Sequence, residues 1–253
     1  MINTPAICAK CASVDLQRNG TRDGHARYRC TACGHQARLV PAAAARTARY
    51  AQVDRLLAER NSQSSIVRVT GVSRVAVARL AKKAQVPASC LPRRRSKKAQ
   101  KKRWEVLELD EMWTFVGRKP RKVWLWLAVE RARRCIVAWV LGDRSAATAL
   151  RLWQALPTRY RRHCWYFTDL LPAYCRLIAG LLPAYAQVLP RWQHRPCPKG
   201  EGQTSIVEAV NCALRQRCGV LVRKSCSFSK CLVMHKARIK IVIDNYNRAL
   251  LPN

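Results

Sequence analysis

The chain has 253 residues, enough for two domains, and 49% of them are hydrophobic, so at least one sizeable core can form. It carries 48 lysines and arginines against 14 acidic residues, a formal charge of +34. So basic a chain needs a polyanionic partner, which favours nucleic acid over a membrane surface and leaves an RNA-scaffold protein as the alternative. The sequence has no apolar run long enough to cross a membrane and no basic-then-apolar leader, so it predicts neither a membrane span nor a signal peptide.

Residues 1–40 are predicted to form a zinc ribbon. Cys8 and Cys11 form one Cys-x-x-Cys pair, and Cys30 and Cys33 form the second. Each pair offers two thiolates, which together suit tetrahedral Zn²⁺. Two disulfides or four unbound thiols are the alternatives. The total of 13 cysteines is odd, so complete pairing is impossible and the remaining thiols are expected to be reduced, as in the cytosol.

Residues 45–90 are predicted to form a helix-turn-helix domain that binds double-stranded DNA. A turn at Thr70-Gly71-Val72 separates two helical patterns, and Ser73 is a suitable N-cap for a helix over 74–83. That helix is basic and is expected to enter a DNA groove. Its candidate DNA contacts are Arg74, Arg79, Lys82 and Lys83. A plain helical hairpin is the alternative.

Residues 91–103 are predicted to be a basic linker. Lysines and arginines make up most of the stretch 93–103. Such a run cannot bury itself and is expected to follow phosphates, unless it is a solvated spacer. Its candidate DNA contacts include Arg93, Arg94 and Arg95.

Residues 104–253 alternate strand-like and helix-like patterns, which predicts an α/β catalytic domain. Expected strands cover 105–110, 123–130, 134–141, 164–168 and 185–189, and expected helices cover 146–156, 204–217 and 229–248. Three consecutive strands followed by alternating helices are typical of the ribonuclease-H-like plan, a mixed five-stranded sheet with helices. In that plan the first and fourth strands are neighbours.

Three carboxylates are placed where such a domain would have its active site. Asp110 and Asp169 each follow an apolar strand, and Glu208 lies in a helical pattern. Mg²⁺ or Mn²⁺ needs oxygen ligands of this kind, and two such ions can assist phosphoryl transfer. Glu201 is the rival third carboxylate, but it lies between glycines in a loop.

Other acidic residues are expected to support the site rather than to bind metal. Strand periodicity puts Glu108 on the face of Asp110, where it can act as a neighbouring acid, and puts Glu111 on the opposite face. Asp143 precedes a helical pattern and is expected to be a helix cap.

The chain resembles the bacterial transposases of the insertion-sequence-one family, which have an Asp-Asp-Glu site. The matching stretches are Leu109–Gly117, Val123–Trp126, Gly142–Ser145, Thr168–Tyr174, Val207–Asn211 with Leu214-Arg215, Arg223-Lys224, Phe228–Lys230 and His235-Lys236. The resemblance implies that Asp110, Asp169 and Glu208 are the metal-binding triad. It implies that Asn211 and Arg215 face the site or the DNA, and His235 is either a further contact or an ordinary helix-surface residue.

The resemblance also implies a function. A transposase of this family binds the terminal inverted repeats of its element and cleaves and joins DNA strands, as at least a dimer when two ends are paired. It is a bacterial cytoplasmic, nucleoid-associated protein. The chain departs from the family at Leu170-Leu171 and Ala209, where polar residues are frequent. The alternatives are a DNA-binding regulator whose triad is inactive and a structure-selective nuclease of the same fold.

Overall fold

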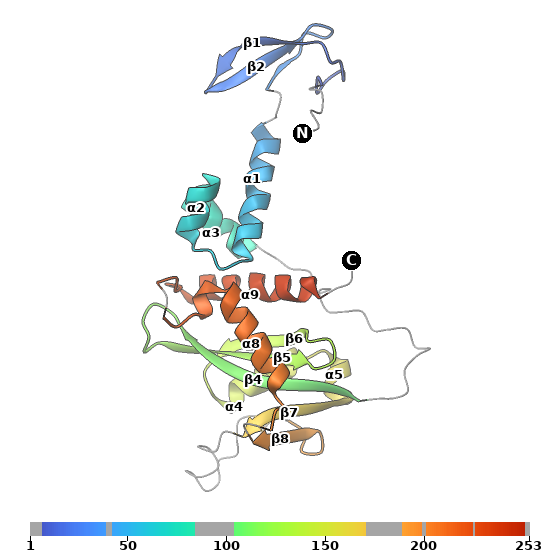
Figure 1. The fold of residues 1–253 in the computed structure, drawn as a ribbon, viewed down its shortest axis with the longest axis vertical. Coiled ribbons are helices and arrows are strands. Elements are labelled where there is room, and N and C mark those ends of the chain that lie inside the picture. The colour runs from blue at the N-terminus through green and yellow to red at the C-terminus, as the bar shows by residue number, and fades with distance from the viewer. Residues whose placement is uncertain are drawn as a thin grey trace, which may run out of the picture. The chain divides into compact units, whose positions relative to one another are not determined.

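The computed structural model of the chain describes residues 7–38, 42–83, 104–170, 189–198, 201–224 and 226–250 (Figure 1). The chain divides into two compact units, Met1–Val53 and Asp54–Asn253. The boundary between them falls within helix α1 (Ala42–Leu57). Each unit has its own architecture.

The first unit contains a small antiparallel sheet of three strands in the order β1-β2-β3. The strands are β1 (Leu16–Arg22), β2 (His25–Cys30) and β3 (Gln36–Ala37). Most of their side chains are exposed or only partly buried, so this sheet buries little apolar surface. A segment of this kind needs a further stabilising element, and the four cysteines beside it are the candidates.

After the end of α1, the second unit continues with two short helices, α2 (Gln63–Thr70) and α3 (Arg74–Lys83). Gly71 ends α2 with φ +66°, a left-handed conformation that glycine adopts without strain. Ser73 Oγ accepts a hydrogen bond from the backbone N–H of Ala76, which confirms the predicted N-cap of α3. Helix α3 packs against the last helix of the chain, α9 (Leu232–Ala249).

The rest of the second unit is built on a mixed sheet of five strands in the order β6-β5-β4-β7-β8. Its strands are β4 (Glu105–Phe115), β5 (Lys122–Glu130), β6 (Ile136–Gly142), β7 (Cys164–Leu170) and β8 (His194–Pro198). Strand β5 is antiparallel to both of its neighbours, whereas β7 is parallel to β4 and to β8. The first and fourth strands of the sheet, β4 and β7, are therefore neighbours, as predicted, and β4 lies at the centre.

Helices cover both faces of this sheet, and each face has its own hydrophobic core (Figure 1). On one face lie α4 (Ala146–Ala155) and α5 (Thr158–Arg162), and on the other lie α8 (Ser205–Arg217), the 3-10 turn η3 (Gly219–Leu221) and α9. Strand periodicity divides β4 between the two cores: Leu107 and Leu109 pack toward α4, and Met112 packs toward α8.

Two predicted strands need correction. Strand β4 continues to Phe115, well beyond its predicted end, so Asp110 lies in the middle of the strand. The fifth strand in the described part of the sheet is β8; of the predicted strand 185–189, only Leu189 is described, and it lies in a bend. Leu189 is buried in the core, which accounts for an apolar residue at this position. Strand β8 has the sequence His-Arg-Pro-Cys-Pro; its two prolines are tolerated in an edge strand, but they do not give the sequence pattern of a typical strand.

Candidate active site and cysteine cluster

One face of β4 holds α8 in place through alternate residues. Glu108 Oε2 accepts a hydrogen bond from the backbone N–H of Val207 at 2.9 Å, in the first turn of α8. Farther along the strand, Thr114 Oγ1 donates to the carbonyl of Val220 at 2.8 Å, in the turn that follows α8. Asp110 lies between these two contacts and on the same face, because side chains alternate along a strand. The helix is thus fixed near both ends, with Asp110 beneath it.

Parallel pairing brings Asp110 and Asp169 to neighbouring positions. The register pairs Leu109 of β4 with Thr168 of β7, and the two aspartates are the next residues on their strands. Both side chains project toward the face that α8 covers. Two strands and two helices separate these carboxylates in the sequence, and only the adjacency of β4 and β7 brings them together.

Helix α8 presents three polar side chains to the same place. Asn211, which is 5% exposed, donates from Nδ2 to Oδ2 of Asp110 at 2.5 Å. Glu208 lies one turn before Asn211 and Arg215 one turn after it, at the spacing that puts residues on one helix face. The guanidinium Nε of Arg215 is buried without a hydrogen-bond partner.

The site concentrates negative charge around Asp110. Burial, followed by repulsion from the carboxylates of Glu111, Asp169 and Glu208, raises the pKa of Asp110 to about 7. Oxygen ligands whose charges repel one another fit a divalent cation of the Mg²⁺ type, which would relieve that repulsion. Among the described residues, only cysteines bring three or more possible ligand atoms within 4.8 Å of one another, so the three carboxylates lie farther apart than that.

The other candidate acids have structural partners. Glu111 accepts from Arg144 at 2.8 Å, in keeping with the prediction that it supports the site rather than binding metal. Asp143 Oδ1 accepts from the hydroxyls of Ser145 and Thr148 at 2.6 Å, and these bonds lower its pKa. The predicted helix cap is therefore wrong in its residue: the N-cap of α4 is Ser145, and Asp143 supports it by accepting a hydrogen bond from its hydroxyl.

The ion pair between Glu108 and Arg131 is not apparent from the sequence. Glu108 is 1% exposed, and its Oε1 accepts from Nε of Arg131 at 2.6 Å. Arg131 also stacks over the ring of Phe167, 4.3 Å from its centroid. The sequence feature that could have indicated this ion pair is a glutamate within a strand of apolar residues, because a buried carboxylate requires a partner.

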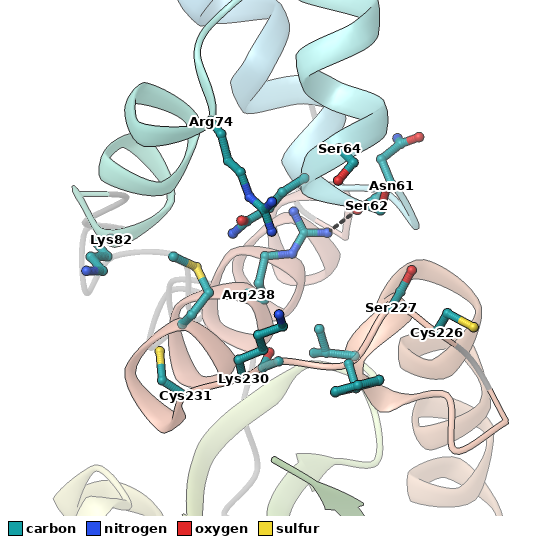
Figure 2. A pocket seen from close by; sticks show the side chains of 16 residues that line it. Asn61, Ser62, Ser64, Arg74, Lys82, Cys226, Ser227, Lys230, Cys231 and Arg238 are labelled. Carbon is teal, nitrogen blue, oxygen red and sulfur yellow. Dashed lines mark hydrogen bonds between the residues drawn. The ribbon is translucent and has the colours of Figure 1, made fainter. Parts of the chain in front are cut away.

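The remaining predicted DNA contacts lie in different surroundings in the structure. All four basic residues of α3 are exposed; Arg74 and Lys82 line a cavity of about 500 Å³ (Figure 2), whereas Arg79 and Lys83 lie outside its lining. His235 is fully buried, with neither ring nitrogen bonded, so it is neither a helix-surface residue nor exposed to contact DNA. The basic linker, with Arg93, Arg94 and Arg95, lies outside the described residues.

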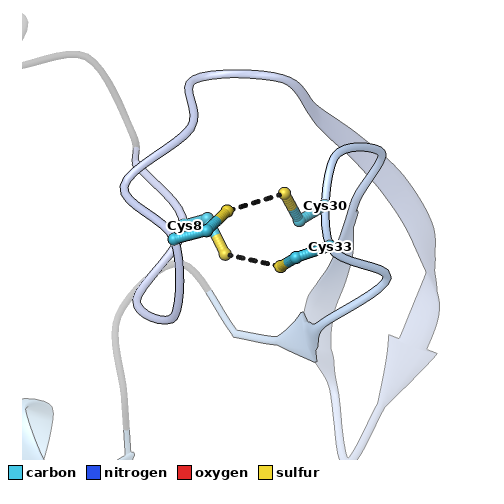
Figure 3. A group of neighbouring side chains, drawn as sticks. Cys8, Cys30 and Cys33 are labelled. Carbon is cyan, nitrogen blue, oxygen red and sulfur yellow. Dashed lines mark hydrogen bonds between the residues drawn. The ribbon is translucent and has the colours of Figure 1, made fainter.

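The four cysteines of the first unit form a compact cluster (Figure 3), and their Sγ atoms all lie within 4.8 Å of one another. Cys8 Sγ is 3.6 Å from Cys33 Sγ, and Cys11 Sγ is 3.5 Å from Cys30 Sγ. Zn–S bonds of about 2.3 Å in a tetrahedron place sulfurs about 3.8 Å apart, so the cluster could hold a structural zinc ion. It is compatible with the predicted zinc ribbon.

The cluster sits on two equivalent turns. The backbone N–H of Ala12 donates to the carbonyl of Cys8, and the N–H of Gly34 donates to that of Cys30, both at 2.9 Å. Both donor residues have positive φ, +59° at Ala12 and +70° at Gly34. Hydrogen bonds from the backbone N–H groups of Lys10 and Cys11 lower the pKa of Cys8 to about 6, which favours the thiolate that binds metal.

Comparison with known proteins identifies the family. The family model described as IS1 transposase matches residues 105–247, more than half of the chain. The chain belongs to the IS1 transposase family. The matched region of this IS1-family protein runs from the first residue of β4 into α9 and includes Asp110, Asp169 and Glu208.

Individual relatives agree with this assignment. The chain is 37% identical over 128 residues to the insertion element IS1 protein InsB of Shigella flexneri, covering 51% of this chain and 86% of the relative. It is 36% identical over 128 residues to the insertion element IS1 4 protein InsB of Escherichia coli K12, covering 51% and 67%. Family membership supports a transposase and hence a DNA-processing enzyme. Among the described residues, no helix is long and apolar enough to cross a membrane.

Proposed function

We propose that this protein is a DNA transposase that binds the terminal inverted repeats of an insertion sequence and catalyses metal-dependent strand cleavage and strand transfer. The observation that carries the proposal is the position of Asp110. It neighbours Asp169 through the parallel pairing of β4 and β7 and receives a hydrogen bond from α8, the helix that bears Glu208. The strand order with the first strand at the centre supports a ribonuclease-H-like fold.

In this proposal Asp110, Asp169 and Glu208 would hold Mg²⁺ or Mn²⁺, which would supply Lewis acidity for an in-line displacement at phosphorus. Asn211 holds the carboxylate of Asp110 in one orientation. Arg215 lies on the same helix face, and its guanidinium Nε has no hydrogen-bond partner. This group would bind a DNA phosphate. Glu208 is favoured over Glu201 because it lies on α8 one turn before Asn211, which bonds Asp110, whereas Glu201 lies in a bend before the helix.

The DNA-binding part of the proposal rests on the chain up to the end of α3. The cysteine cluster would carry zinc in a zinc ribbon. Helices α2 and α3, joined at Gly71, would act as a helix-turn-helix, with Arg79 and Lys83 on an exposed side of α3. Two ends of one element must be paired, so at least a dimer would assemble on DNA, in the cytoplasm and at the nucleoid.

The test is nicking of a supercoiled plasmid that carries the element's own ends, with Mg²⁺ or Mn²⁺. Asp110→Asn and Glu208→Gln keep shape but remove charge, and each should abolish nicking at the ends, whereas the matched control Glu201→Gln should retain it. End binding without cleavage by the native protein would instead favour a DNA-binding regulator. Cleavage of branched DNA without preference for the ends would favour a structure-selective nuclease.

A further inference from the structure

A basic cavity that includes none of the three carboxylates lies where α2 and α3 meet α9 and the segment that precedes it (Figure 2). Its cavity has a volume of about 500 Å³. Four cationic side chains line it: Arg74, Lys82, Lys230 and Arg238. Among the described residues of the lining, none is acidic. Cations gathered without a counter-charge repel one another, so the cavity favours an anion.

The most buried of these cations is incompletely bonded. Arg238 is 3% exposed, and its Nη2 donates to the carbonyl of Asn61 at 2.8 Å. Its Nη1 is buried and has no hydrogen-bond partner. Figure 2 shows Arg74, Lys230 and Arg238 pointing into the same space. A buried donor without an acceptor is costly, and an anionic oxygen in the cavity would satisfy it.

Backbone and hydroxyl groups add to this preference. Ser62, the N-cap of α2, and the next two residues line the cavity, as does Cys231, the N-cap of α9. The N-terminal ends of helices carry partial positive charge and free N–H groups, which suit phosphate. Ser229 Oγ, also in the lining, is buried without a partner. The donors therefore come from two helix starts, a buried hydroxyl and the cations.

We propose that this cavity binds a phosphate group, and that in the working protein the phosphate belongs to the DNA backbone. The choice of DNA rests on the proposed function; the phosphate chemistry does not. In this arrangement Arg74 and Lys82 contact the phosphate in the cavity. Arg79 and Lys83, the other two basic residues of α3, lie outside the cavity and do not contact this phosphate. A phosphate bound by residues of both α3 and α9 would link DNA binding by α3 to the part of the unit that bears the carboxylates.

The experiment uses two thiols in the lining, Cys226 and Cys231, which are free and exposed. Their alkylation by iodoacetamide is followed by mass spectrometry in the full chain, with inorganic pyrophosphate, with duplex DNA, and with potassium chloride at matched ionic strength. With phosphate ligand at about ten times its Kd, alkylation should slow by about tenfold. Lys230→Gln should lose most of the protection, and the matched control Lys236→Gln, an exposed lysine outside the lining, should keep it.

If both ligands protect the thiols and Lys230→Gln reduces that protection, the result supports a DNA phosphate in the cavity. If pyrophosphate alone protects them, the result supports a free phosphate compound as the ligand. Protection by neither ligand overturns the proposal, as does protection by duplex DNA that Lys230→Gln leaves unchanged. A protein that is protected by pyrophosphate but binds no DNA keeps the phosphate site and fails the proposed function, so the two failures are distinguishable.

Discussion

The amide Nδ2 of Asn211 lies 2.5 Å from Oδ2 of Asp110, which joins helix α8 to the central strand of the sheet. This bond orients the carboxylate whose pKa is raised to about 7 and fixes the helix face that carries Glu208 and Arg215. Asn211 acts through Asp110 rather than on the metal, and it is therefore a positioning residue.

Replacing Asn211 by alanine should reduce plasmid nicking by about 10–100-fold, the usual effect of losing a hydrogen bond to a metal-binding carboxylate. The N–H donor also stabilises the charged form of Asp110, so its removal should shift the acidic limb of the pH–rate profile to higher pH. Both quantities come from nicking rates measured over a pH series with Mn²⁺. Asn245→Ala, on α9, is the control. An unchanged pH profile would argue that Asn211 serves only the packing of α8.

Glu108→Gln should destabilise the second unit. The substitution removes a buried charge that binds Arg131 and the first turn of α8. Because Arg131 is itself 31% exposed, the loss should be about 1–3 kcal/mol, as for a hydrogen bond to a charged group. The free energy of unfolding is obtained from urea titration followed by tryptophan fluorescence. Glu59→Gln, an exposed carboxylate in the same unit, should change it by less than about 0.5 kcal/mol. A small loss in Glu108→Gln would mean that α8 is held by its apolar contacts alone.

Stability should fall in mild acid because of His235. Burial lowers its pKa to about 4 from its ordinary value of 6.5, so the folded protein holds the neutral ring. The unfolded chain takes up a proton below pH 6.5, so the stabilisation present above that pH is lost between pH 6.5 and about 4. The contribution is about 3 kcal/mol. His194, whose pKa is also lowered to about 4, acts in the same window.

The measurement is urea unfolding of native protein and His235→Leu from about pH 4 to about pH 8. Both ring nitrogens lack partners, so leucine should be tolerated at neutral pH and should flatten the acid dependence. His25→Leu, in an exposed position, is the control and should keep the native slope. Equal slopes in native protein and His235→Leu would contradict the buried neutral histidine.

One zinc ion per chain should be released by a strong chelator, and residues 7–38 should lose their order when it leaves, because this segment has almost no core. Cys30→Ser should lower the zinc content of purified protein, while Cys212→Ser, an exposed thiol outside the cluster, should not. Zinc is quantified by atomic emission, and order by the amide spectrum of the segment. An ordered segment without zinc would leave the cluster as four unbound thiols.

Local patterns in the sequence are enough to predict most of the elements and to single out the residues of the proposed chemistry. The cysteine spacing, the Ser73 cap, the helix that bears Glu208 and the strand that bears Asp169 each depend on a few neighbouring residues. The end of β4 is harder to predict because the apolar run around Leu109 stops at Asp110, while the strand continues through a polar and aromatic stretch. Strand β8 is not predicted from the sequence pattern either, because it is an edge strand that contains prolines.

Which distant residues meet depends on the tertiary structure. The pairing of β4 with β7 puts Asp110 beside Asp169, and the contact of Glu108 with Val207 sets α8 over them. The same long-range packing buries His235 and lines one cavity with basic residues of both α3 and α9. Sequence periodicity records which face of an element is buried, but the partner of that face depends on how the whole chain closes.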